Sequence, residues 1–291
     1  METPDPSTIN FPTGKPHVSY SEVRAWKECP WRHKLLYIDK IGKDEPSPYL
    51  SYGSALHDGV ENFLNTGKMD KGPVLDKIRE EWSLHGFDSP EWIKAQADYR
   101  KSQGWKPKSH DYIDSWLEWA SNSLEELPDF LKQEFGDYEV ISAEEQLYEY
   151  FPGCDIFFKG FIDALLKVKI RGKEYYYVID WKTAGDKGWY ASKRRDILTW
   201  AQIALYKSFW KNKNGFDTKQ VRCGFVLLKR GGKPGNICEL VKVSVGPKAE
   251  ENAMSIFRSM VKNVRKGLYL KNRASCLFCE FKNTAACPGS R

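Results

Sequence analysis

Residues 159–183, KGFIDALLKVKIRGKEYYYVIDWKT, are the stretch of this sequence that decides the fold. Two runs rich in aromatic and β-branched residues flank Arg171 and Gly172. This dipeptide suits a tight turn, because Gly tolerates the positive φ that a short hairpin loop requires. The stretch therefore predicts a β-hairpin, and three polar residues within it, Asp163, Asp180 and Lys182, are candidates for chemistry.

Two loop lengths fit this hairpin, and each gives a different pairing. With a two-residue loop over 171–172, Asp163 lies directly opposite Asp180. With a four-residue loop over 171–174, Asp163 lies opposite Lys182. Because side chains alternate along a strand, Asp180 and Lys182 share one face in both cases. Either register places an acid on one strand against an acid-lysine pair on the other.

This arrangement favours a metal site. Two carboxylates that face each other across a hairpin repel unless a positive group lies between them. Mg²⁺ suits that place because it takes hard oxygen ligands and keeps waters on its open positions, which fits metal-assisted phosphodiester hydrolysis. The alternative is a salt bridge on an exposed sheet face. The apolar run Tyr175–Ile179 argues against it, because it indicates a strand bound to the core, where unpaired acids are costly.

The rest of the chain alternates strand-like and helical segments, which indicates an α/β protein. Strand-like runs besides the hairpin cover residues 138–151, 220–229 and 236–245. Helical patterns cover residues 19–36, 53–65, 196–211 and 248–266, and residues 37–52 are turn-rich. The sequence has no Gly-x-x-x-x-Gly-Lys-Ser/Thr loop, which excludes an ATP-driven motor of the phosphate-loop kind.

Four pieces of the sequence, in order, resemble the PD-(D/E)XK nuclease superfamily and specifically its RecB-like branch. They are the helix start Gly53–His57, the Gly-x-x-Asp strand Gly160–Asp163, the acid-x-lysine strand Val178–Thr183 and the Gln-x-x-x-Tyr segment Gln202–Tyr206. Each piece is weak alone, but the series in this order is specific. The resemblance covers residues 19–65 and 140–291. It implies a restriction-endonuclease-like α/β core with a central mixed sheet flanked by helices.

The resemblance also implies roles for particular residues. His57, Asp163, Asp180 and the main-chain carbonyl of Trp181 would bind Mg²⁺ or Mn²⁺. Lys182 would position the attacking water, so that Asp163, Asp180 and Lys182 form the catalytic set. Without the resemblance, a lone His beside an apolar helix stripe is more often structural.

Other polar residues stand near this predicted site. Gln202 and Tyr206 are one helical turn apart and share a face, which suits contact with DNA, although a polar helix edge is the alternative. Glu61 lies one turn from His57 and could orient its imidazole. Glu144 or Glu145, on the strand before Gly160, could add a further polar contact.

Four of the seven Cys form a second candidate site. Cys276, Cys279 and Cys287 lie close together near the C-terminus, and Cys29 lies far upstream before a Pro. Four thiolates can hold an Fe–S cluster, and the resemblance to AddB, exonuclease V and CRISPR-associated RecB-type nucleases implies [4Fe–4S]. The gap of seven residues between Cys279 and Cys287 departs from the usual five. A structural Zn²⁺ is the alternative, and either metal would close a loop of about 250 residues.

The three remaining cysteines, Cys154, Cys223 and Cys238, lie in or beside strand-like runs and are expected to be ordinary buried thiols. An odd Cys count in a chain without an export signal argues against a disulfide framework.

Composition limits the class of protein. The 291 residues are 41% hydrophobic and 29% charged, which is typical of a globular chain. The net charge of +6 mildly favours a polyanionic binding partner. No apolar run reaches the roughly 20 residues that cross a bilayer, and the N-terminus has no secretory signal pattern. We therefore expect no membrane association and a location in the cytoplasm, as a bacterial or phage protein.

The expected organisation is a flexible arm over residues 1–18 and one nuclease domain over residues 19–291. Residues 66–135 would form a helical insertion within this domain, and residues 276–291 with Cys29 would form the Fe–S staple.

The expected function is a metal-dependent deoxyribonuclease. By the resemblance, it would be an exonuclease acting on single-stranded DNA with a free end, in replication, recombination or repair, with a helicase or recombinase as a possible partner. One alternative is a non-catalytic Fe–S subunit that binds DNA or acts as a scaffold. Intact Asp163, Asp180 and Lys182 argue against it. Another is a zinc-stapled protein unrelated to nucleic acid.

Overall fold

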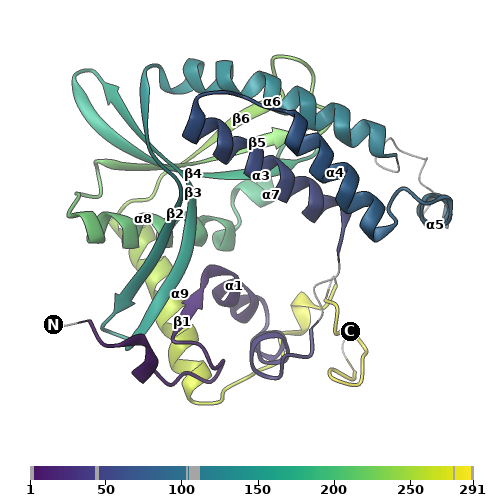
Figure 1. Cartoon of the computed structure of the whole chain (residues 1–291). Coiled ribbons are helices and arrows are strands. Elements are labelled where there is room, and N and C mark those ends of the chain that lie inside the picture. The colour runs from purple at the N-terminus through teal and green to yellow at the C-terminus, as the bar shows by residue number, and fades with distance from the viewer. Residues whose placement is uncertain (1–2, 43–45, 103, 105–111, 278, 290–291) are drawn as a thin grey trace.

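The chain forms one mixed β-sheet with helices on both faces (Figure 1). The computed structural model describes residues 3–42, 46–102, 104, 112–277 and 279–289. The sheet has six strands in the order β1-β3-β4-β5-β6, and β2 pairs with β3 as well. This arrangement confirms the predicted α/β class with a central mixed sheet flanked by helices.

The strands pair in both orientations. β3 pairs antiparallel with β2 and β4, and β5 with β6, whereas β1 is parallel to β3 and β4 is parallel to β5. The strands are β1 His17–Ser19, β2 Tyr138–Phe151, β3 Ile156–Ile170, β4 Lys173–Ala184, β5 Val221–Lys229 and β6 Cys238–Val243.

The hairpin between β3 and β4 has the two-residue loop. Ile170 pairs with Lys173, and the same register continues to the pair Ala164 and Ile179. Both loop residues, Arg171 and Gly172, have positive φ of 50° and 79°. Positive φ at both positions is the backbone of a type I′ turn, whose twist matches the strands. The four-residue loop considered from the sequence is therefore wrong.

One edge of β3 has an opening. β1 pairs with β3 at residues 157–159, and β4 pairs with it from Ala164 onward. Within the described chain, no strand pairs with residues 160–163 on this edge, while β2 covers the other edge. Asp163 therefore lies where β4 parts from β3.

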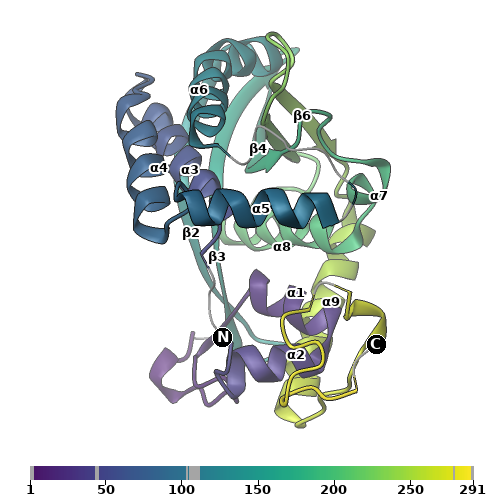
Figure 2. The same ribbon diagram turned by 90° about the vertical axis from the view of Figure 1, so that its right-hand side faces the viewer.

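Two apolar cores lie on opposite faces of the sheet. One contains Val23, Leu205 and Phe257 from α1, α8 and α9, and the other contains Leu56 and Trp82 from α3 and α4 together with residues of α6. Figure 2 shows these two helical layers from the side. The helices of eight or more residues are α1 Tyr20–Glu28, α3 Pro48–Thr66, α4 Gly72–His85, α5 Pro90–Ser102, α6 Ile113–Phe135, α8 Ile197–Asn214 and α9 Pro247–Arg265.

The helical pattern predicted over residues 19–36 is interrupted. α1 ends at Glu28 because Cys29 is extended, with φ −160°. A residue before Pro disfavours the helical region, and Pro30 follows here. The chain then continues as the short α2 Pro30–His33 and a π-helical turn, Lys34–Ile38.

α3 begins earlier than the sequence pattern suggests. Its N-cap is Ser47, whose side chain accepts from the Leu50 N–H, and Pro48 takes the first helical position. Residues 48–52 are therefore helical, although their Pro and Ser content reads as turn.

The segment predicted as a flexible arm contributes to the core. Phe11 is buried and β1 joins the sheet. The predicted insertion contains α4, α5 and α6, and residues 103 and 105–111 of it lie outside the described residues. None of the helices in the described part of the chain is long and apolar enough to cross a membrane.

Candidate active site

Two contacts hold the Asp163 carboxylate at the opening in β3. The Trp181 backbone N–H donates a hydrogen bond to Asp163 Oδ2 at 2.7 Å. His57, on α3, places Nδ1 3.7 Å from the same oxygen and Nε2 3.2 Å from the Trp181 carbonyl oxygen. The backbone N–H at position 181 thus bonds to a side chain, which fixes the acid where the two strands separate.

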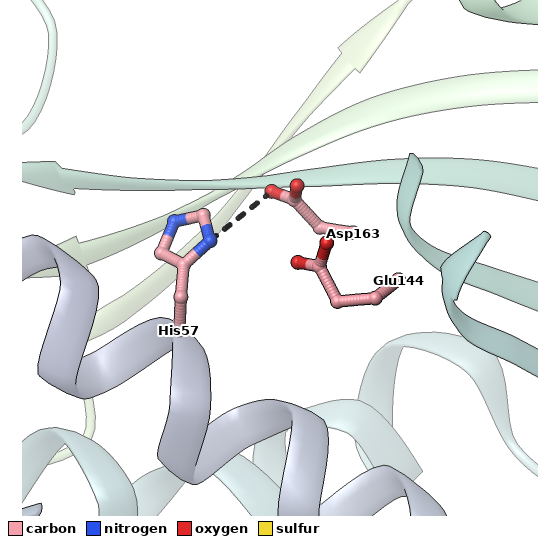
Figure 3. A group of neighbouring side chains, drawn as sticks. All are labelled: His57, Glu144 and Asp163. Carbon is pink, nitrogen blue, oxygen red and sulfur yellow. Dashed lines mark ion pairs between the residues drawn. The ribbon is translucent and has the colours of Figure 1, made fainter. Parts of the chain in front are cut away.

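Glu144 completes a group of three potential metal ligands. One ligand atom each from His57, Glu144 and Asp163 lies within 4.8 Å of the others, and the three side chains converge in Figure 3. Glu144 has a left-handed backbone with φ 56°, which turns its side chain relative to a regular strand. Its neighbour Glu145 instead lies 3.8 Å from Lys213 on α8. Of the two Glu considered from the sequence, the structure places Glu144 at the site.

Asp180 and Lys182 form a buried ion pair on β4. Asp180 is 1% exposed, and its Oδ2 lies 2.6 Å from Lys182 Nζ. Lys182 keeps 34% of its side chain exposed, so it connects the buried acid to solvent. Asp180 is not among the three residues whose ligand atoms all lie within 4.8 Å of one another, and one of its oxygens faces Lys182.

The electrostatics of this group show excess negative charge. Burial and the neighbouring Asp180 carboxylate raise the pKa of Asp163 well above its ordinary value. Burial also raises the pKa of Glu144, with Glu61 adding to the effect. The pKa of His57 is lowered by burial and by the nearby Lys182 ammonium, which favours the neutral imidazole.

These residues fit a divalent cation. The group offers two carboxylates and a neutral imidazole, and the Trp181 carbonyl lies beside that imidazole. Carboxylate and carbonyl oxygens suit Mg²⁺, and Mn²⁺ accepts the imidazole as well. A cation would also relieve the repulsion that raises the pKa of Asp163. The donor set and its charge therefore match such an ion.

Two of the predicted motifs pack against each other. A Cβ added at Gly160 would lie 2.7 Å from Cε1 of Tyr206, so only Gly permits this close approach. Tyr206 is buried, and Gln202 donates from Nε2 to the Tyr206 hydroxyl at 3.4 Å. Burial raises the pKa of Tyr206, with Asp180 and Asp163 adding to the shift. The helix carrying Gln202 and Tyr206 thus braces β3 beside the acids.

The four cysteines predicted to form a cluster line one cavity near the C-terminus. Cys29, Cys276, Cys279 and Cys287 all contribute to its wall. The Asn272 backbone N–H donates to Cys29 Sγ at 3.3 Å. No three of the four sulfur atoms lie within 4.8 Å of one another in the described part of the chain.

Polar contacts join the two distant segments that form this cavity. Arg32 pairs with Glu280, with Nε 2.9 Å from Oε2 and Nη2 3.0 Å from Oε1. Trp31 donates from Nε1 to the Ala286 carbonyl at 3.1 Å. The other three cysteines, Cys154, Cys223 and Cys238, are buried thiols, as predicted.

Comparison with known proteins identifies the class. The model of the PD-(D/E)XK nuclease superfamily matches residues 17–288, so the chain belongs to this superfamily and its fold is restriction-endonuclease-like. The crystal structure of a protein from Eubacterium rectale, named "Putative exonuclease", is similar in fold, with a TM-score of 0.54 and 11% identity. The similarity covers 92% of this chain and 88% of that one. Comparison with curated protein sequences finds no match.

Family and site together define a nuclease with a candidate metal centre at the edge of β3. Sequence reasoning named His57, Asp163 and the acid-lysine pair, and the structure places them around this edge. The sequence did not decide between Glu144 and Glu145, because no sequence pattern predicts the left-handed backbone that directs the Glu144 side chain to the site.

Proposed function

We propose that this protein is a metal-dependent deoxyribonuclease that degrades single-stranded DNA from a free end. The convergence of His57, Glu144 and Asp163 beside the Asp180–Lys182 pair carries the proposal. The superfamily supports hydrolysis of DNA. The preference for single strands rests on the resemblance to RecB-like exonucleases. The name of the similar fold, "Putative exonuclease", supports only action from a free end.

In this proposal His57, Glu144, Asp163 and the Trp181 carbonyl would hold Mg²⁺ or Mn²⁺, with Asp180 reaching it from β4. The bound cation supplies a Lewis acid for the phosphate and lowers the pKa of a bound water.

The chain's own groups orient the reactants. Lys182 Nζ positions the attacking water, and Asp180 holds that ammonium at 2.6 Å. Burial alone would lower the pKa of Lys182, but the Asp180 and Asp163 carboxylates outweigh it and raise the pKa. Lys182 therefore stays charged and stabilises negative charge that develops on the phosphate. The hydrogen bond from the Trp181 N–H holds the Asp163 carboxylate beside the Asp180–Lys182 pair.

The test uses matched linear and circular single-stranded DNA with Mg²⁺ or Mn²⁺, alongside Asp180→Asn. The proposal predicts metal-dependent loss of the linear form alone, abolished by the substitution. Cutting of both forms would keep the site and make the enzyme an endonuclease. Absence of cutting by a folded protein that binds DNA would contradict the proposal and favour a non-catalytic DNA-binding or scaffold subunit.

We further propose that Cys29, Cys276, Cys279 and Cys287 hold a [4Fe–4S] cluster that staples residues 276–291 to the N-terminal part of a single domain, residues 19–291. Their common cavity supports this assignment. A zinc ion with sulfur ligands at about 2.3 Å would bring the sulfurs within about 4 Å of one another. No three of the four sulfurs in the described part of the chain are that close, and the resemblance to RecB-like nucleases is what favours the larger cluster.

Metal analysis of freshly purified protein distinguishes these alternatives. A brown protein with iron and acid-labile sulfide would support the cluster, and stoichiometric zinc without iron would contradict it. The expected setting, by the resemblance to RecB-like nucleases, is DNA replication, recombination or repair, beside a helicase or recombinase.

A further inference from the structure

The segment between β4 and α8 lies directly beside the candidate active site and is rich in basic and aromatic residues. Residues 185–196 read GDKGWYASKRRD, with four cations and two aromatic side chains. The segment begins three residues after Lys182, and its last residue, Asp196, is the N-cap of α8. This segment has no role in the candidate site described above.

α1 and α8 cover the sheet face that carries Asp180 and Lys182, because these two residues alternate along β4 with Val178, which packs in the same core as Val23 and Leu205. The Tyr20 hydroxyl of α1 donates to the Leu198 carbonyl of α8, which brings Arg24, one turn after Tyr20, toward Lys193, just before α8.

The Lys193 pKa is lowered by burial and by the nearby Arg24, and Lys182 adds to the effect. The Arg24 charge also acts to lower the pKa of Lys182, although the Asp180 and Asp163 carboxylates outweigh this effect. Three cations from three elements, Arg24, Lys182 and Lys193, are thus near enough to repel one another.

The acids around these cations have other partners. Asp196 Oδ2 lies 3.6 Å from Lys193 Nζ, but the same carboxylate accepts from the N–H groups of Leu198 and Thr199 as the cap of α8. Glu28, the partner of Arg24 at 2.9 Å, is shared with Arg32 at 3.0 Å. The charges of Arg24 and Lys193 are therefore only partly compensated, which suits a polyanion, whereas Lys182 is paired with Asp180.

The segment has a fixed shape. Arg194 donates from Nε to the Trp189 carbonyl at 2.9 Å, and Trp200 donates from Nε1 to the Arg194 carbonyl at 2.7 Å. Arg194 also pairs with Glu239 on β6. At Gly188, φ is 68°, a left-handed backbone that favours Gly at this turn.

This fixed segment presents a large aromatic side chain to solvent. Tyr190 is 73% exposed and lies three residues before Lys193, one turn of the short α7 Ala191–Arg194. Trp189, in contrast, packs on Phe225 with ring centroids 5.0 Å apart. An exposed ring on a fixed turn near Lys193 is suited to stack on a nucleic acid base.

We propose that Arg24, Lys193 and Tyr190 form a strand-binding rim that holds single-stranded DNA next to the scissile phosphate. Arg24 and Lys193 bind backbone phosphates, and the Tyr190 ring stacks on a base. This inference rests on the proposed nuclease function and extends it by naming the subsite for the flanking nucleotides. Because stacking tolerates every base, the rim binds without sequence preference.

The two kinds of contact give different signatures in a binding experiment. The Kd of the full-length protein for labelled oligo(dT) is measured in EDTA over a series of salt concentrations. Lys193→Ala and Arg24→Ala should each reduce the slope of log K against log salt by about 0.7. Tyr190→Ala should raise Kd about tenfold at every salt concentration without changing the slope, and Tyr190→Phe should restore binding.

The control is Lys219→Ala, an exposed cation at the opposite end of β5, whose Kd and slope should match the wild type. If the wild type degrades DNA but the variants of Arg24, Lys193 and Tyr190 keep its Kd and slope, the strand-binding rim is refuted while the proposed nuclease function is supported. If the wild type neither binds nor degrades DNA, both proposals are wrong.

Discussion

The site at the edge of β3 and the cavity of four cysteines are built in opposite ways. Asp163 and Asp180 lie on neighbouring strands whose register is set by a two-residue turn, and a backbone N–H fixes one of them at 2.7 Å. Cys29 and Cys276 come from segments almost 250 residues apart, outside the sheet ladders. The comparison shows that two paired strands, with one backbone hydrogen bond where they separate, can position acids for chemistry, whereas the cysteines depend on loop contacts.

The difference has a physical consequence for each region. In the acid site the backbone holds groups that repel one another, so removing a charge should impair chemistry and spare the fold. In the cysteine cavity a bound metal would supply part of the folding energy, so removing a ligand should impair the fold first.

The largest effect is expected from Asp163→Asn. Because burial and Asp180 raise the Asp163 pKa, a neutral side chain there should leave the melting temperature unchanged or higher. DNA hydrolysis should fall about a thousandfold, because a metal ligand is lost. The control Glu174→Gln changes an exposed acid on the same hairpin and should leave the rate unchanged. A rate near that of the wild type in Asp163→Asn would remove Asp163 from the catalytic set.

The second largest effect is expected in the cysteine cavity. Cys29→Ser should abolish iron binding and lower the melting temperature by at least about 5 °C, because the staple between the termini is lost. Cys154→Ser, at a buried thiol outside the cavity, should keep its iron. Metal analysis and thermal unfolding measure both. Full iron content and an unchanged melting temperature in Cys29→Ser would refute the ligand assignment.

A smaller effect is expected from Glu144→Gln. Loss of one negative charge from the ligand group should raise the Mg²⁺ concentration for half-maximal rate about tenfold. The matched control is Glu145→Gln, which faces Lys213 rather than the site. Titration of both variants with Mg²⁺ compares them directly, and equal shifts would show that Glu144 has no special place at the metal.

The smallest effect concerns the start of α8 beside the acid site. Burial opposes ionisation of Asp196, but its bonds from Thr199 and the Leu198 N–H outweigh it and lower its pKa. A lowered folded-state pKa contributes stability at neutral pH that is lost as pH falls through that pKa, below about pH 4.

Asp196→Ala should therefore cost about 1 kcal/mol of unfolding free energy at neutral pH, while Asp196→Asn, which can still cap the helix, should cost less. The difference between wild type and Asp196→Asn should shrink in acid. Denaturant unfolding at neutral and acid pH measures it, and a difference that grows as pH falls would reverse the assigned sign.

Much of the fold was predictable because it follows from local pattern. The hairpin at Arg171 and Gly172 could be read from the sequence, but its loop length could not, because two lengths fitted. The structure has the two-residue loop, and the pairing ends at Ala164 and Ile179. β1 was missed because a three-residue strand in a Pro- and Ser-rich arm has no period to detect. The early start of α3 was missed because Pro48 reads as turn until Ser47 is seen to cap it.

The site was predictable where motifs carry it and not where the backbone departs from regular geometry. His57 and Lys182 belong to motifs, whereas Glu144 enters the site through a left-handed residue in the middle of a strand. The proximity of Arg24 to Lys193 depends on the docking of α1 against the start of α8, where Tyr20 donates to the Leu198 carbonyl. Such tertiary contacts leave no local trace in the sequence.

We propose that the acid site does the chemistry and that the cysteine cavity maintains the structure. The most direct test measures DNA hydrolysis and iron content in the same preparation of Asp180→Asn, beside the wild type. We expect Asp180→Asn to keep its full iron content while its rate of DNA hydrolysis falls about a thousandfold. Hydrolysis at the wild-type rate by a folded, iron-loaded Asp180→Asn would contradict it.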